Sequence, residues 1–295
     1  MGKVICIGEA LIDFMPSQSG RLQTVTSFEK CPGGAPANVA ACVAQLGVPS
    51  VVLTMLGCDP FGDFLVESMS AVGIDVSHIA RTNEANTALA FVSHSDDGDR
   101  DFLFYRNPSA DMLLSPENVP ENCFKAGDIL HFCSVDLVDA PCRRAHDRAI
   151  EIAKKKGCTI SFDVNLRFPL WNDEQELKET VLRYIPFADI VKVSDEELAF
   201  LGPISAPQLI VTKGKNGACL NDVFVKGFDT PAVDTTGAGD AFIGSFLAQL
   251  QQGKPLSPEL LRYCHAVSSI VVAQKGAIAV MPTPAQVDEF LAVHG

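Results

Sequence analysis

Six short apolar segments recur along this chain, and longer segments with the apolar spacing of helices separate most of them. The six segments are Val4 to Gly8, Ser50 to Leu56, Asp128 to Phe132, Thr159 to Val164, Asp189 to Val193 and Gln208 to Thr212. Apolar runs of this length indicate strands that are buried on both faces. Strands that alternate with helices indicate a mostly parallel sheet, so the pattern predicts an α/β fold.

Two segments depart from this alternation and show the patterning of half-exposed strands. One is about Phe14 to Phe28, and the other is the pair Thr87 to Ser95 and Arg100 to Tyr105 around the turn Asp96-Asp97-Gly98-Asp99. Such strands bury only one face, so we expect a small β element outside the main sheet, or alternatively a plain surface hairpin. Because no internal repeat or linker interrupts the chain, we expect a single domain over residues 1–295.

Composition narrows the class of protein. A hydrophobic content of 47% in 295 residues is sufficient for a large core. The formal net charge of −13 argues against binding to nucleic acid or to anionic membranes. Ten cysteines without any Cys-x-x-Cys pattern favour buried free thiols. The chain starts directly in an apolar strand that reaches Glu9 and Asp13, which does not fit a signal peptide, so we expect a cytoplasmic protein.

The segment Asp234 to Phe242 carries the strongest chemical signal. Its residues Gly237, Ala238, Gly239 and Asp240 stand where a loop enters an apolar helix that begins near Ala238. A helix N-terminus offers unpaired N–H groups and a partial positive charge to an anion such as phosphate. A carboxylate is repelled by such an anion unless it serves as the general base for a neighbouring hydroxyl. An ordinary acid in the first helical turn remains the alternative for Asp240.

A second glycine pair, Gly33-Gly34, precedes another helix, which we expect to run to about Leu46. Paired glycines let a small ligand lie against bare backbone, and the nearby Asn38 carries both a donor and an acceptor for hydroxyl groups.

Together, these two segments resemble the signature motifs of the ribokinase-like family of sugar kinases. Further segments match the family's pattern in the same order along the chain. These are Gly8-Glu9-Ala10-Leu11-Ile12-Asp13, Asp163-Val164-Asn165-Leu166-Arg167, Lys192-Val193-Ser194-Asp195-Glu196-Glu197 and Thr212-Lys213-Gly214. The resemblance implies a three-layer fold in which residues of about 11–29 and 87–106 form a β lid that closes over the sugar and often supplies a dimer contact. It also implies ATP and Mg²⁺ as cofactors.

The resemblance assigns roles to individual residues. For the sugar it implies Asp13, Gly33, Gly34, Asn38, Asn165 and Asp240, and we add Arg106 as a candidate lid contact to the sugar or phosphate. For catalysis it implies Asp240 as the base, the anion hole of Gly237, Ala238 and Gly239, and Arg167 at the transferring phosphate. For the nucleotide it implies Ser194, Thr212, Gly214, Gly217, Gly237, Gly239 and His265. For metals it implies Glu197 for Mg²⁺ through water, and Asp234, Thr236 and Gly276 for a monovalent cation such as K⁺.

The chain departs from its relatives at two positions. Ser194 stands where relatives carry an asparagine, and Ser194-Asp195-Glu196-Glu197 also fits a helix capping box. Only residues 202–207 connect that helix to the next strand, where relatives usually have a further helix. Neither departure removes a residue that the resemblance assigns to the sugar.

Several alternative functions remain to be weighed. The chain has no early Gly-x-Gly-x-x-Gly of a dehydrogenase and no Walker A motif or His-Arg-Asp of other phosphotransferases. A non-catalytic sugar or nucleotide sensor would have no use for Asp240 beside the anion hole. Within the family, Ala35-Pro36 is similar to fructokinases, so we expect phosphorylation of the 6-hydroxyl of D-fructose. Aminoimidazole riboside and 2-keto-3-deoxygluconate kinases are the alternatives.

Overall fold

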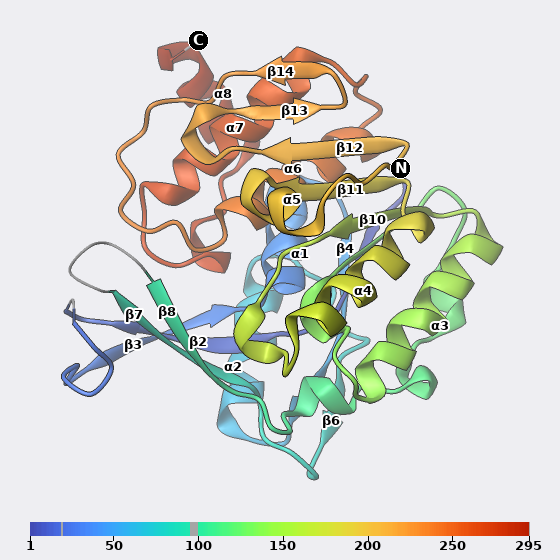
Figure 1. Cartoon of the computed structure of the whole chain (residues 1–295), viewed down its shortest axis with the longest axis vertical. Coiled ribbons are helices and arrows are strands. Elements are labelled where there is room, and N and C mark those ends of the chain that lie inside the picture. Colours follow the sequence, from blue (N-terminus) through green and yellow to red (C-terminus); the bar gives the residue numbers. More distant parts are fainter. Residues whose placement is uncertain (19, 95–99, 295) are drawn as a thin grey trace.

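A sheet of eight strands forms the centre of the molecule in the computed structural model, which describes residues 1–18, 20–94 and 100–294 (Figure 1). Its strands, in spatial order, are β14 (Val223–Val225), β13 (Ala218–Leu220), β12 (Gln208–Thr212), β11 (Ile190–Ser194), β10 (Thr159–Asp163), β9 (Ile129–Cys133), β1 (Val4–Ile7) and β4 (Ser50–Leu53). The pairs from β12 to β4 are parallel, and β13 and β14 add an antiparallel edge. The predicted α/β fold is thus confirmed.

Helices cover both faces of this sheet because its strands are apolar on both faces. The helices are α1 (Ala35–Gln45), α2 (Pro60–Ala71), α3 (Pro141–Lys156), α4 (Glu174–Tyr184), α5 (Asp195–Leu201), α6 (Ala238–Gln251), α7 (Pro258–Val272) and α8 (Pro284–His294). Alternate residues of β1 serve different cores, since Val4 and Cys6 pack with α1, α6 and α7, and Ile5 and Ile7 pack with α3 and α4. This alternation makes three layers.

One predicted strand is divided in the structure. The segment Ser50 to Leu56 forms β4 and then, after Thr54, a separate strand β5 (Met55–Gly57). Strand β5 leaves the main sheet and pairs in parallel with β6 (Ala80–Thr82). The apolar pattern continues across the break because both strands are buried, so local sequence did not reveal the change of partner.

A second sheet of four strands projects from the main body (Figure 1). Its strands, in spatial order, are β3 (Phe28–Gly33), β2 (Leu11–Pro16), β7 (Leu89–His94) and β8 (Arg100–Tyr105). This is the predicted β lid, although β2 and β3 occupy only the ends of the segment Phe14 to Phe28 and extend beyond it. The predicted turn Asp96-Asp97-Gly98-Asp99 and the adjoining Ser95 lie outside the described residues.

Aromatic side chains hold the small sheet together on one face. Phe91 of β7 stacks on Phe14 of β2 with ring centroids 4.7 Å apart, and it also contacts Phe28 and Tyr105 edge to face. Phe14 in turn contacts Phe61 of α2, at a centroid distance of 5.9 Å. The last contact joins the lid to the main body through α2. Among the described residues, no helix has both the length and the apolar character that a membrane crossing requires.

Candidate active site

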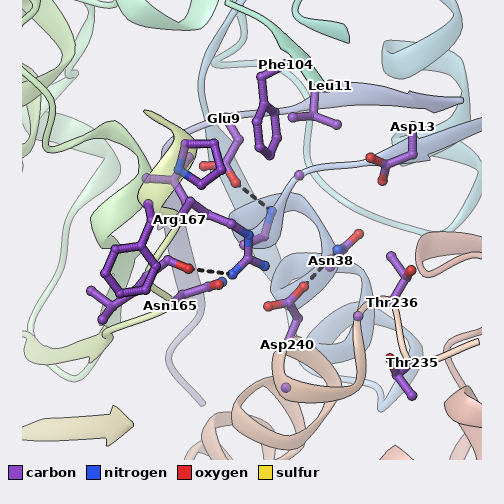
Figure 2. Close-up of a pocket in the computed structure, with 18 of the residues that line it drawn as sticks. Glu9, Leu11, Asp13, Asn38, Phe104, Asn165, Arg167, Thr235, Thr236 and Asp240 are labelled. Atoms are coloured by element: carbon purple, nitrogen blue, oxygen red, sulfur yellow. Dashed lines mark hydrogen bonds between the residues drawn. The ribbon is translucent and has the colours of Figure 1, made fainter. Parts of the chain in front are cut away.

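Three adjoining cavities lie at the carboxyl ends of the central parallel strands, where ligands of open α/β sheets bind. The acidic cavity has a volume of about 460 Å³, and its polar lining includes Glu9, Asp13, Asn38, Arg167, Lys192 and Asp240 (Figure 2). The apolar cavity has a volume of about 350 Å³, and its lining includes Ala232, Ala238, Phe242, His265 and Val272. The connecting groove measures about 730 Å³, and its lining includes Lys192, Ser194, Glu197, Thr212 and Gly214. Thr235 and Gly239 line all three.

Asp240 meets the acidic cavity from the first turn of α6. Its Oδ2 accepts a hydrogen bond of 2.8 Å from the side-chain nitrogen of Asn38 on α1 (Figure 2). Burial raises the pKa of Asp240 above its ordinary value, while the Asn38 hydrogen bond, Lys192 and Arg167 oppose that shift. The residue is thus a buried carboxylate with a raised proton affinity, as a general base requires.

The backbone at the start of α6 depends on Gly237. This residue is the N-cap of the helix and adopts a φ of 75°, in the left-handed region that favours glycine. A Cβ at this position would lie 2.6 Å from the Cβ of Ala277, so the close packing also excludes a larger residue. Because α6 begins at Ala238 and Gly239 lines all three cavities, the N-terminus of the helix lies where the cavities meet. The predicted anion hole therefore lies beside Asp240.

Asp13 stands opposite, on strand β2 of the lid. Its carboxylate packs so closely on Gly33 of β3 that a Cβ on Gly33 would lie 2.0 Å from Asp13 Oδ2. Gly33 therefore makes room for the acid, and it does not itself line the acidic cavity. Burial raises the pKa of Asp13 to about 7, and Arg167 opposes the shift. Gly34 joins Asp13 and Asn38 in the lining of the acidic cavity.

Asn38 also has an acceptor free for a ligand. Its Oδ1 is buried and has no hydrogen-bond partner among the described residues. An unsatisfied buried amide oxygen costs free energy unless a ligand or water pairs with it. The cavity therefore presents the Asn38 oxygen as an acceptor and the Asp13 carboxyl group as a further hydroxyl-binding group.

Asn165 and Arg167 enter the acidic cavity from the loop after β10. Asn165 adopts a φ of 39°, an uncommon value for a residue with a side chain, and Ser134 Oγ donates a 3.2 Å hydrogen bond to its carbonyl oxygen. Arg167 Nη1 donates to the Leu166 carbonyl at 2.9 Å, and its guanidinium group points toward Asp240 (Figure 2). A cation therefore faces the predicted base across the cavity.

Ser194 and Glu197 form the capping box that their sequence predicts. Ser194 Oγ accepts from the Glu197 amide at 3.1 Å, and the Ser194 amide donates to Glu197 Oε2 at 2.8 Å. Glu197 Oε1 accepts from the Leu166 amide at 2.7 Å. Each carboxylate oxygen keeps a lone pair for a water, so the residue fits an outer-sphere role at Mg²⁺. Both side chains line the connecting groove.

Four of the seven predicted nucleotide residues line the apolar cavity, while Ser194 lines the connecting groove, Gly237 lines the acidic cavity and Gly217 lines none of the three. The four are Thr212, Gly214, Gly239 and His265. His265 packs edge to face on Phe242 at a centroid distance of 5.1 Å, and burial lowers its pKa to about 4, so the ring is neutral at pH 7. Gly217 lies outside the linings of all three cavities, and its carbonyl accepts a 2.8 Å hydrogen bond from the Lys213 amide.

The three candidate cation residues lie together. Asp234 Oδ1 accepts from the Thr236 amide at 2.8 Å, and its Oδ2 accepts from the Gly276 amide at 3.0 Å. The buried carboxylate therefore fixes two loops that flank the start of α6. A single acidic group at this place agrees in charge with a monovalent cation such as K⁺.

Arg106 lies away from the acidic cavity. It follows β8, and its buried guanidinium group donates to Asp111 and Asp136 in a paired cluster below the lid. Both partners are almost fully buried, and Arg106 is absent from the cavity lining. In this conformation it anchors the root of the lid, and a contact with sugar or phosphate would require it to leave both carboxylates.

Sequence reasoning missed two charged residues of the site. Lys192 lies inside the apolar strand β11, and Glu9 follows β1 and accepts a 2.8 Å hydrogen bond from the Ala35 amide. Both line the acidic cavity. Charged residues are seldom fully buried. Lys192 stands in a strand predicted to be buried on both faces, and this could have marked it as a functional residue.

Comparison with known proteins places this geometry in context. A model of the pfkB family of carbohydrate kinases matches residues 1–284. The chain is 40% identical to probable fructokinase-2 of Arabidopsis thaliana, over 99% of this chain and 97% of that protein.

Two solved structures share the fold over nearly the whole chain. The fructokinase of Vibrio cholerae O395, solved with fructose, ADP and calcium, is 33% identical, with a TM-score of 0.88 and 99% of each chain covered. Aminoimidazole riboside kinase of Salmonella enterica, solved with its riboside and an ATP analogue, is 31% identical, with a TM-score of 0.87 and 98% of this chain and 100% of that chain covered.

Proposed function

The chain belongs to the pfkB family of carbohydrate kinases, and we propose that it transfers the γ-phosphoryl group of ATP to the 6-hydroxyl of D-fructose. The comparisons show a carbohydrate kinase similar to fructokinases. What we propose beyond this is the sugar, ATP as the phosphoryl donor, and the residues that bind and catalyse. The hydrogen bond between Asn38 and Asp240 is the observation that carries it, because it sets the base between the acidic cavity and the helix N-terminus.

In the proposed reaction, Asp240 accepts the proton of the 6-hydroxyl group. The hydroxyl oxygen forms a bond to the γ-phosphorus, the bond from that phosphorus to the β-γ bridging oxygen breaks, and ADP leaves. The amide groups of Gly237, Ala238 and Gly239 and the Arg167 guanidinium group stabilise the negative charge of the phosphoryl group. The proton remains on Asp240 until the product leaves.

The other polar groups of the acidic cavity hold the sugar. Asp13 accepts from hydroxyl groups, the unpaired Asn38 Oδ1 accepts from another, and Gly34 lets the ring lie against the backbone, while Gly33 makes room for the Asp13 carboxylate. The apolar cavity, with His265 and Phe242, takes the adenine base.

Two metal ions complete the proposal. Glu197 would hold Mg²⁺ through water, and the ion would supply positive charge to the phosphates. The Asp234 loops suit a monovalent cation, which would steady the backbone at the start of α6.

A panel of substrates tests the choice of sugar. We expect purified enzyme with Mg-ATP to phosphorylate D-fructose with a higher kcat/KM than ribose, 2-keto-3-deoxygluconate or aminoimidazole riboside, and the product to carry phosphate on carbon 6 by NMR. A preference for the riboside would favour the second candidate, which the structural match to aminoimidazole riboside kinase supports. Binding of sugar and ATP without any turnover would identify a sensor.

The lid has its own test. Closure over the sugar would exclude water and prevent ATP hydrolysis. We expect fructose to slow hydrogen exchange in residues 87–106, and equal exchange with and without fructose would remove the lid from the mechanism.

Leu103 and Tyr105 expose 46% and 59% of their surface on the lid, which supports a proposed homodimer contact there. Sedimentation velocity would detect it.

A further inference from the structure

Lys192 occupies an unusual place in the molecule. It lies in the central strand β11, is only 6% exposed, and donates to both carboxylate oxygens of Asp163 on β10, at 2.9 and 2.8 Å. Burial disfavours its charged form, but Asp163 and Glu197 raise the pKa of Lys192 above its ordinary value. A buried and fully charged ammonium group therefore stands within the sheet.

The ammonium group also lies beside Gly239, in the first turn of helix α6. A Cβ placed on Gly239 would lie 3.0 Å from Lys192 Nζ, so the third N–H of the ammonium group has a path toward the helix N-terminus. Lys192 lines both the acidic cavity and the connecting groove, and Gly239 lines all three cavities. Lys192 thus lies at the boundary between the acidic cavity and the connecting groove, where the phosphoryl group would pass from nucleotide to sugar.

The charges around this boundary are mostly negative. Asp13 and Asp240 face the acidic cavity and Glu197 faces the groove. Of these two spaces, Lys213 and Lys215 line only the groove, and Arg167 and Lys192 are the cations that line both among the described residues. These carboxylates would repel an incoming phosphate. A fixed cation at the boundary would offset that repulsion.

We propose that the Lys192 ammonium group contacts the phosphoryl group during its transfer and is therefore a catalytic residue. This inference rests on the proposed transfer at Asp240. Asp163 then serves to position the ammonium group, because two of its N–H groups are fixed on the carboxylate and the third is directed to the phosphate. The competing account is that Lys192 only neutralises Asp163 and stabilises the sheet.

Matched variants separate these two accounts. Lys192→Gln removes the charge and keeps a hydrogen-bonding side chain, while Asp163→Asn keeps the ammonium group and removes the ion pair. The double variant Asp163→Asn/Lys192→Gln leaves no unpaired buried charge and provides a folded protein if the single variant unfolds. For each variant we would measure kcat, the melting temperature, and the affinities for ADP and the β,γ-imido analogue of ATP by calorimetry.

If the proposal holds, both variants that lack the ammonium group lose kcat by about 10²–10³-fold, as for removal of one transition-state donor. Their affinity for the ATP analogue falls by about tenfold, while ADP affinity stays at the wild-type value. Asp163→Asn keeps the preference for the ATP analogue. A folded double variant with wild-type kcat, or equal losses for ADP and the analogue, would overturn the proposal. The nucleotide measurements need no sugar, so they stand even if the enzyme phosphorylates a sugar other than fructose.

Discussion

The acidic and apolar cavities meet at Gly239 but are built on opposite principles. Three carboxylates, Glu9, Asp13 and Asp240, line the acidic cavity, and burial raises the pKa of each one. No carboxylate lines the apolar cavity in the described part of the chain, and its histidine, His265, is neutral at pH 7. Buried acids destabilise a fold unless a ligand or a partner compensates for their lost hydration. Elsewhere the fold offsets this cost with buried cations, as at Asp136 beside Arg106 and Asp163 beside Lys192, whereas the acidic cavity leaves room for a ligand to do so.

The largest expected effect concerns the base in the acidic cavity. Asp240→Asn keeps the shape of the side chain, removes the proton acceptor and relieves repulsion with phosphate. We expect kcat to fall by about 10²–10⁴-fold, while ATP affinity holds or improves. Steady-state kinetics and calorimetry with ATP would check this. A folded variant with wild-type kcat would show that Asp240 has no role in proton transfer.

A smaller effect is expected from the partner of that base. The Asn38 hydrogen bond lowers the pKa of Asp240, so Asn38→Ala should raise that pKa further. Because the reaction requires the unprotonated carboxylate, activity is lost as the pH falls through this pKa. The acid limb of kcat/KM should therefore move to higher pH by about one unit. An acid limb that stays in place would argue that Asn38 only binds sugar.

The apolar cavity should respond differently to truncation. His265→Ala removes a ring that packs on Phe242 and lines the cavity, so we expect the KM for ATP to rise by about tenfold. The KM for fructose should remain unchanged, as it should in His78→Ala, a control remote from the cavities. If the KM for fructose rose equally, the two cavities would not be separate binding sites.

The smallest expected effect is on stability. Because the pKa of Asp13 is raised to about 7, the folded protein is favoured while this group is protonated and loses that advantage as the pH rises toward 7. Asp13→Asn imitates the protonated acid, so it should stabilise the ligand-free protein most at pH 8 and least near pH 4. We expect a rise in melting temperature of about 2–4 °C at pH 8, together with loss of fructose binding. Calorimetric scans at the two pH values would measure it.

Local sequence patterns predicted the sheet well because its strands are apolar on both faces. Each of the six predicted strands is present in the main sheet, and α6 begins at the predicted Ala238. The patterns failed where a strand changed its partner, as at Thr54, because burial on both sides of the break leaves the pattern unchanged. The extent of β2 and β3 was also missed, since the glycine motif itself forms the end of β3.

The sequence by itself determined the fold class, the family and the position of the glycine turn at Gly237-Ala238-Gly239, because each can be recognised from short local motifs and from their order along the chain. Only the tertiary structure decided that Asn38 holds Asp240 across 202 positions and that Lys192 reaches the start of α6. It also placed Arg106 with Asp111 and Asp136 below the lid. A side chain's charge state and partners depend on which distant strands and helices surround it, and that arrangement forms only when the sheet and its helices pack together.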